Sequence, residues 1–285
     1  MAAKQTMKFI NHLDAELTLN WIKDVAGLGI PPVDLTTTRG FRQPGYSIQY
    51  AEYQHRPFTI SFDLRAATYE ALALQRRAII AFFGDKQPKT FSYTRDGVEY
   101  QLTGVYLSGL FDTGIREARQ LEAVLQFIAG DPYFIRAIES ETLADEAAQL
   151  QWECEYVDGG IEYSNRESAQ VTIDYQGDVE APLKVRFAGP ATNPWVENVT
   201  TGAKLEVTKE ILTGETLEIT SGYGQKKVEI INDDTGARAN AFHYITSGSV
   251  FIQLQPGTNI ITFGASAGAS SAAVEISYNE LYVGI

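Results

Sequence analysis

The stretch GDVEAPLKVRFAGPATNPWVENVTTGAKLEV, residues 177–207, decides the class of fold. In it, Leu183, Val185 and Phe187 alternate with charged residues, and the alternation resumes at Leu205 after a Thr-Thr-Gly turn. A period of two over a short run bounded by Gly, Pro or Asn is typical of a β-strand with one buried face. The stretch therefore predicts short antiparallel strands joined by tight turns.

The same pattern extends over residues 170–285. Short alternating runs recur at regular spacing, and no strong helical period interrupts them. These runs include Val171/Ile173/Tyr175, Leu217/Ile219, Val228/Ile230 and Val274/Ile276/Tyr278. Strands of this length and spacing predict a C-terminal β-sandwich or jelly roll over residues 169–285.

The first half also reads as strands, with one helix among them. Alternating apolar residues in PFTISFDL predict a strand over 57–64. The period then changes to three or four between Thr68, a candidate N-cap, and Gly84, a candidate helix stop. We therefore predict a helix over 68–83.

Two further runs complete this half. Asp96-Gly97 lies between aromatic-rich runs in TFSYTRDGVEYQLTGVYL, which predicts a hairpin with a left-handed turn. Residues 119–129 alternate again and are assigned to a strand, although their residue types are also compatible with a helix. The sequence thus predicts a mainly β chain. Its N-terminal α+β domain, residues 1–140, would be a β-sandwich or split barrel with one main helix.

Charge separates the two halves. Residues 1–140 carry 15 Lys and Arg against 15 Asp and Glu, whereas residues 141–285 carry 8 against 21, so the net charge of −13 lies in the second half. The acidic residues 141–168 lack alternation and are assigned to a connector, with a helical turn near 141–150. Such acidity excludes nucleic-acid binding through phosphates, and a need for solubility alone explains it equally well.

Little in the sequence favours catalysis. The single cysteine, Cys154, excludes an internal disulfide, and the three histidines form no HxxxH or HExxH pair. No GxSxG elbow is present. No apolar run approaches the about 18–20 residues that cross a bilayer. We therefore expect a soluble protein, made in a cytoplasm, with no catalytic residue, cofactor or bound metal.

Some short motifs superficially suggest chemistry. Gly222–Lys227 looks like a phosphate loop, but it separates two strand-like runs and is predicted to be a hairpin turn. Residues 232–236 offer oxygen ligands for calcium without the spacing of an EF-hand. His243 is assigned to a strand rather than to a catalytic base.

Three residues are candidates for contact with a ligand or partner. A sugar ring could stack on Trp195, with Asn193 beside it, and on Tyr223 in the predicted hairpin turn, because carbohydrate sites pair an aromatic face with side-chain amides. Packing or subunit contact is the alternative role for such aromatic residues.

Several motifs, in order along the chain, resemble one family. GDVEAPLKVRFAGPATNPWVENVTTGAKLEV (177–207), LTGETLEITSGYGQKKVEI (212–230) and FIQLQPGTNIITF (251–263) resemble the C-terminal domain of distal tail proteins of long-tailed, siphovirus-type bacteriophages. The closing Leu-Tyr-Val-Gly-Ile is similar to the usual ending of that family. In the first half, the helix at 68–83 and FIAGDPYF (127–134) carry the resemblance.

The resemblance implies a virion protein that is not an enzyme. Its N-terminal domain would form a hexameric ring at the distal end of the tail, which joins the tail tube to the tail-tip hub. DNA would pass through the ring without sequence-specific binding, and no membrane or cofactor is implied. The C-terminal domain would be a galectin-like, carbohydrate-module-like sandwich that holds receptor-binding or accessory proteins.

Two other functions stay open on the residues alone. A carbohydrate-binding module for host cell-surface adhesion would rest on the sandwich and on Trp195. A jelly-roll hydrolase would rest only on the abundance of acidic side chains.

Overall fold

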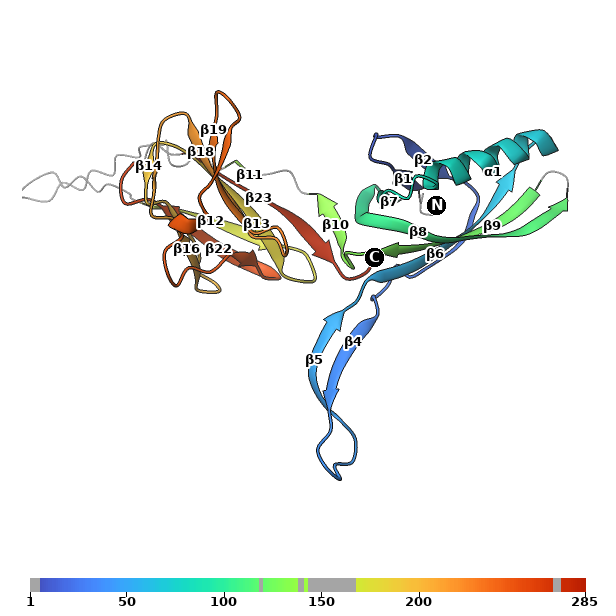
Figure 1. The fold of residues 1–285 in the computed structure, drawn as a ribbon, viewed down its shortest axis with the longest axis horizontal. Coiled ribbons are helices and arrows are strands. Elements are labelled where there is room, and N and C mark those ends of the chain that lie inside the picture. The colour runs from blue at the N-terminus through green and yellow to red at the C-terminus, as the bar shows by residue number, and fades with distance from the viewer. Residues whose placement is uncertain (1–5, 118–119, 138–140, 143–167, 269–272) are drawn as a thin grey trace, which may run out of the picture. The chain divides into compact units, whose positions relative to one another are not determined.

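The computed structural model describes residues 6–117, 120–137, 141–142, 168–268 and 273–285 (Figure 1). The chain divides into two compact units. Unit 1 comprises Met1–Arg136 and Tyr282–Ile285, and unit 2 comprises Ala137–Leu281. Cys154 and most of the acidic connector lie outside the described residues.

Unit 1 is built from antiparallel strands and one helix. Its elements are β1 (Thr6–Ile10), β2 (Glu16–Leu19), β3 (Ile22–Ala26), β4 (Val33–Thr38), β5 (Ser47–Tyr53), β6 (Arg56–Arg65), α1 (Tyr69–Phe83), β7 (Lys89–Arg95), β8 (Val98–Glu117), β9 (Gln120–Ala129) and β10 (Phe134–Ala137). Pairing gives the strand order β2-β1-β7-β8-β9-β6-β3, with β10 beside β8 and β4–β5 as a separate hairpin. The long β8 pairs with β7 over residues 98–105 and with β9 over residues 105–117, so it joins two halves of one sheet.

Phenylalanine rings fill the space between these two halves. The Phe9 ring from β1 stacks on the Phe127 ring from β9, with centroids 4.6 Å apart. The Phe58 ring from β6 lies 5.0 Å from that of Phe91 from β7. Phe83, the last residue of α1, meets Phe9 edge-on at 5.2 Å. Rings of this size dominate the energetics of a core, and Phe58 and Phe127 occupy alternating positions of the strands predicted over 57–64 and 119–129.

The predicted helix and turns of unit 1 are confirmed. Thr68 is the N-cap of α1, since its hydroxyl accepts a hydrogen bond from the Ala71 N–H at 3.2 Å, and Gly84 follows the last helical residue. The turn at Asp96-Gly97 has positive φ at both residues, 53° and 86°. Residues 120–129 form β9, so the strand assignment holds over the helical alternative.

Unit 2 is a β-sandwich. Its elements are β11 (Glu141–Thr142), β12 (Ser168–Tyr175), β13 (Ala181–Ala188), β14 (Ala191–Thr192), β15 (Trp195–Asn198), β16 (Ala203–Glu206), β17 (Glu210–Ile211), β18 (Glu215–Thr220), β19 (Lys227–Asn232), β20 (Arg238–Asn240), the 3-10 helix η1 (Phe242–Tyr244), β21 (Gln253–Leu254), β22 (Gly257–Gly264) and β23 (Ala273–Tyr282). One sheet has the order β23-β13-β18-β19-β20 and the other β12-β22-β15-β16. The rings of Phe187 and Phe263, one from each sheet, lie 6.3 Å apart across the core.

Two details differ from the predictions for this half. His243 lies in η1, so its assignment to a strand is wrong. The cause is local: the Asn240 side chain accepts from the Phe242 N–H at 2.8 Å, and the Tyr244 N–H donates to the Ala241 carbonyl. The helical turn near 141–150 falls on residues of which only Glu141 and Thr142 are described, and these two form β11 beside β23.

Candidate assembly surfaces

Strands β4 and β5 form a hairpin, here called the ribbon (residues 33–53), which projects from the rest of unit 1 (Figure 1). Every residue of both strands is exposed. Tyr53, at the end of β5, meets the Tyr133 ring edge-on at 6.1 Å, but a hairpin that is mostly without such contacts is at best marginally stable in water. The ribbon therefore has the character of an element that is completed by a partner.

The two faces of the ribbon differ in chemistry. Residues paired directly across an antiparallel ladder share a face, and successive residues alternate between faces. The register, which shifts once between Thr36 and Thr37, puts Val33, Leu35, Thr37, Ile48, Ala51 and Tyr53 on one face. The opposite face carries Asp34, Thr36, Thr38, Ser47, Tyr50 and Glu52. An apolar face and a polar face on one element are the pattern of a strand pair that is half buried in its functional state.

The tip of the ribbon is basic and aromatic. Phe41 is 94% exposed, and the Arg42 guanidinium lies 5.3 Å from the centre of its ring. Arg39 Nε donates to the Gln43 carbonyl at 3.0 Å and also lies near the Tyr46 ring. Arginine beside exposed aromatic rings is a composition enriched in protein interfaces.

A second exposed feature of unit 1 is centred on Trp21, between β2 and β3. Its side chain is 62% exposed, although its backbone has a φ of 56°, which is uncommon for a bulky residue. The Arg65 guanidinium lies 4.7 Å over the indole ring and also pairs with Asp63 at 2.9 Å. The indole is therefore held in place within the single chain, and Trp and Arg are residue types enriched in interface hot spots.

Exposed large hydrophobic side chains are unevenly divided. Among the described residues, fifteen of them belong to unit 1 and five to unit 2. Eight of the fifteen lie between residues 30 and 53, in the ribbon or immediately before it. Contiguous exposed apolar surface marks an interaction site, so unit 1 is the better candidate for assembly.

The structure places the three residues singled out in unit 2 as follows. Trp195 begins β15, half-buried, with the Lys204 ammonium 5.0 Å from its ring. Asn193 has a φ of 50° and donates its N–H to the Lys209 carbonyl. Tyr223 lies in the turn between β18 and β19, on the other sheet. Asn193 and Trp195 are thus neighbours in the chain, while Tyr223 belongs to a different group, and the contact role of all three stays a prediction.

Tyr223 belongs instead to an exposed aromatic cluster. It is 79% exposed, and Lys226 Nζ lies 5.9 Å from its ring and 5.2 Å from that of Phe251. Phe251 in turn stacks on Phe242 at 5.8 Å. The segment Gly222–Lys227 joins β18 to β19, so the predicted hairpin turn is confirmed and the phosphate loop is excluded.

The Asp-rich residues 232–236 form the turn between β19 and β20. Asn232 Oδ1 accepts from the N–H and the hydroxyl of Thr235, and Asp233 Oδ1 accepts from the Thr216 hydroxyl at 2.8 Å. These oxygens therefore stabilise the turn itself. In the described parts of the chain, no group of three His, Cys, Asp or Glu side chains is placed to hold a metal ion.

Two family models match the chain, one in each half. Residues 16–111 match the phage tail protein RIFT-related domain, and residues 176–282 match the siphovirus-type tail component C-terminal domain. The chain belongs to the siphovirus distal tail proteins. Such a protein is a structural component of a phage tail or baseplate. No curated protein matches the chain.

Solved structures share the fold of this distal tail protein along nearly its whole length. SPP1 Dit (gp 19.1), described as a paradigm of the hub adsorption apparatus in phages that infect Gram-positive bacteria, is 12% identical, with a TM-score of 0.69 over 98% of this chain and 99% of that one. A chain of the phage P2 baseplate in its activated conformation with calcium is 10% identical, with a TM-score of 0.51 over 97% and 98%. Both likenesses extend over the two units of the distal tail protein.

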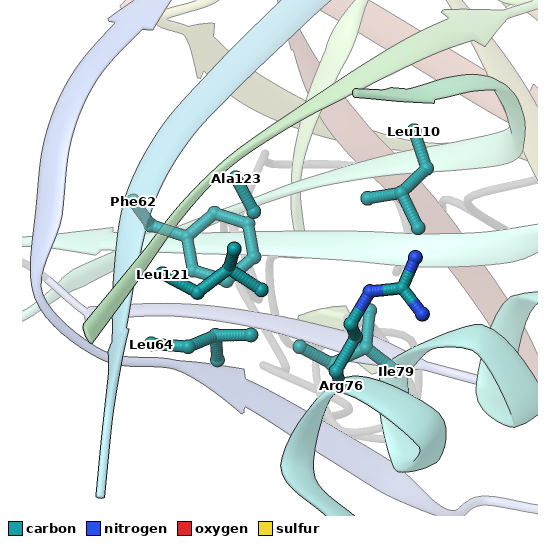
Figure 2. A pocket seen from close by; sticks show the side chains of 7 residues that line it. All are labelled: Phe62, Leu64, Arg76, Ile79, Leu110, Leu121 and Ala123. Atoms are coloured by element: carbon teal, nitrogen blue, oxygen red, sulfur yellow. The ribbon is translucent and has the colours of Figure 1, made fainter. Parts of the chain in front are cut away.

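A hollow between α1 and the sheet of the distal tail protein is apolar and small. Figure 2 shows Phe62, Leu64, Ile79, Leu110, Leu121 and Ala123 around it, with Arg76 as its polar group. Its empty volume is about 230 Å³, part of which is open solvent, against about 300 Å³ for the smallest ligand pockets. It is a gap in packing. Separately, within the described parts of the chain, no helix is both long and apolar enough to cross a membrane.

Sequence reasoning missed the ribbon and Trp21. The signal for the ribbon was present, because Val33-Asp34-Leu35 and Ser47-Ile48 flank a Pro-Gly turn at residues 44–45. No signal marked Trp21, because neither its exposure nor its positive φ can be read from a single sequence.

Proposed function

We propose that this distal tail protein is a hub at the end of the phage tail. Copies of unit 1 join into a closed ring, six in number as the family resemblance implies. The ring connects the tail tube on one side with the tail-tip hub on the other. Unit 2 offers a surface for receptor-binding or accessory proteins, and the protein acts without catalysis after assembly in the host cytoplasm.

The observation that carries this proposal is the exposed apolar surface of unit 1. On the apolar face of the ribbon, Val33, Leu35, Ile48 and Tyr53 are exposed, and Phe41 and Tyr46 are exposed at its tip. A stable interface of standard size takes about 800 Å² from each partner. Such an interface takes about 20–30 residues from each side, and the ribbon, residues 33–53, is of that size, far larger than a small ligand requires.

A ring follows if the ribbon of each copy covers the neighbouring unit 1. Such a contact is heterologous, because it joins two different patches, and heterologous contacts close into rings when the rotation between copies permits. Trp21 and the exposed side chains of α1, Tyr69, Leu74 and Ile80, supply further apolar surface on the same unit. Each copy thus carries both a projecting element and apolar surface to receive one.

The proposal is tested with two neighbouring substitutions in β4. Leu35 lies on the apolar face and Thr36 on the polar face, and both are exposed in the single chain. Leu35→Asp is expected to abolish the ring or raise its midpoint concentration by more than about tenfold, because a charge is placed in an apolar interface. Thr36→Asp, with the same charge one residue away, is expected to assemble like the wild type. Light scattering across a concentration series measures both.

The folded content of the variants is checked by circular dichroism, and neither should differ from the wild type. Equal assembly of the two variants would contradict the role of the apolar face. If the wild type and both variants all fail to assemble, alone and with tail tube protein, that result would contradict the proposed function itself.

A further inference from the structure

Arg56, the first residue of β6, is a completely buried arginine. Its guanidinium donates to four backbone carbonyls, namely Gly27 at 2.8 Å, Gly29 at 2.5 Å, Pro132 at 2.7 Å and Val283 at 2.5 Å. It also lies 4.5 Å over the ring of Phe134. No carboxylate of the described residues pairs with it. Burial lowers the pKa of Arg56 to about 10, which leaves it charged at neutral pH.

The segments that meet at Arg56 are packed too closely for side chains. Gly27 has a φ of 95°, and a Cβ there would lie 2.4 Å from the Pro57 carbonyl oxygen. A Cβ on Gly284 would lie 3.1 Å from the carbonyl carbon of Gly29. The Ile285 N–H donates to the Leu28 carbonyl at 3.1 Å. Residues 283–285 therefore lie directly on the 27–29 loop.

Arg56 lies at the root of the ribbon, where the chain enters β4 and leaves β5, and it is close to both of these connections. It comes three residues after Tyr53, the last residue of β5, and it holds the carbonyl of Gly29, four residues before Val33, the first residue of β4. Two prolines, Pro31 and Pro32, stiffen this second connection. The Gln54 N–H donates to the Pro32 carbonyl at 2.8 Å and ties the two sides together.

We propose that residues 282–285 form a latch. They bind as a peptide in a carbonyl-binding site of unit 1, and through Arg56 they fix the root of the ribbon. The guanidinium is suited to this, because its rigid fork reaches four carbonyls at once, which a lysine ammonium cannot do. Tyr282 adds an edge-on contact with Tyr100 at 5.5 Å. The bound segment supplies one of the four carbonyls and covers the loop that supplies two others.

The latch has a consequence for assembly, which rests on the proposed function. Residues 282–285 follow unit 2 in the chain but belong to unit 1. Unit 1 is therefore complete only after unit 2 has been synthesised. A chain that stops before residue 282 lacks a fixed ribbon and stays out of the ring.

Hydrogen exchange tests the latch on the full chain, in the Leu35→Asp background so that single chains are compared. In a variant that ends at Leu281, and in Arg56→Lys, the amides within residues 22–32 and 54–58, other than Pro31, Pro32 and Pro57, are expected to exchange more than about tenfold faster. Amides of α1 and of β18–β19 in unit 2 should be unchanged. Faster exchange spread evenly over unit 1, or no change at residues 22–32, would overturn the latch.

Assembly is measured in parallel without the Leu35→Asp substitution. The variant that ends at Leu281 and Arg56→Lys should lose the ring, and Ile79→Val, which loosens unit 1 from the side of α1, should keep it. If both latch variants assemble like the wild type, the latch does not control assembly and that part is wrong. If the wild type itself forms no ring, the proposed function fails, while the exchange experiment still decides whether the latch exists.

Discussion

Asp63 is a buried carboxylate, 2% exposed, in β6 of unit 1. It accepts hydrogen bonds from Arg65 at 2.9 Å and Gln120 at 2.8 Å, and Lys23 Nζ lies 2.9 Å from it. Burial alone would raise the pKa of Asp63, but the two hydrogen bonds and the ion pair with Lys23 outweigh it and hold the pKa below the usual 3.8. The same Arg65 lies over Trp21, so the network also holds the exposed indole.

The sign of the pH effect follows from that direction. The pKa of Asp63 is lower in the folded than in the unfolded chain, so its stabilisation is complete above about pH 4 and is lost as the pH falls through the folded value. We expect Asp63→Asn to lower the free energy of unfolding at pH 7 by about 1–3 kcal/mol, because Lys23 and Arg65 lose a charged acceptor.

Urea unfolding of both proteins between pH 2.5 and 7 measures this. The difference in the free energy of unfolding between the wild type and Asp63→Asn should become smaller below pH 4. A difference that stays constant with pH would show that Asp63 does not titrate through this network.

At the scale of the element, α1 depends on a cap that the sequence predicted. Replacement of Thr68 by Ala removes the acceptor for the Ala71 N–H and should cost about 1 kcal/mol, whereas Thr68→Ser keeps the hydroxyl and should cost much less. Chemical denaturation of the two variants measures the difference. Equal losses would mean that the cap hydrogen bond does not stabilise the helix.

Elements with an unbroken period were predictable, and the apolar face of the ribbon was not. PFTISFDL, residues 57–64, keeps strict alternation because each second side chain enters one core. In the ribbon, the register shift at Thr36/Thr37 leaves Gln49 unopposed, so Ile48 and Tyr50 fall on opposite faces. The apolar face therefore becomes visible only once the pairing is known.

The residues at the root of the ribbon were beyond prediction for another reason. Arg56 stands in the sequence as an ordinary polar residue before a strand, and its partners, Gly27, Gly29, Pro132 and Val283, are scattered over more than 250 positions. Only the fold brings their carbonyls together. Asp63 is similar, since an outward position of a strand normally predicts a solvated side chain.

At the scale of the whole molecule, the two units differ in the kinds of side chain near their surfaces. Unit 2 carries charged networks, such as Glu218 with Lys184 and Arg238 on the sheet that contains β13, β18 and β20. Unit 1 presents the ribbon, Trp21 and the outer side of α1. This division agrees with a family of structural tail proteins, in which we assign assembly to unit 1 and presentation to unit 2.

The central claim is that copies of this chain build a closed ring through unit 1. Native mass spectrometry of the purified full-length protein, alone and with tail tube protein, tests it most directly. The account predicts a single closed oligomer of six chains, which a plain electron micrograph shows as a ring with an axial hole. A mass of one chain under every condition, or open filaments of indefinite length, would contradict it.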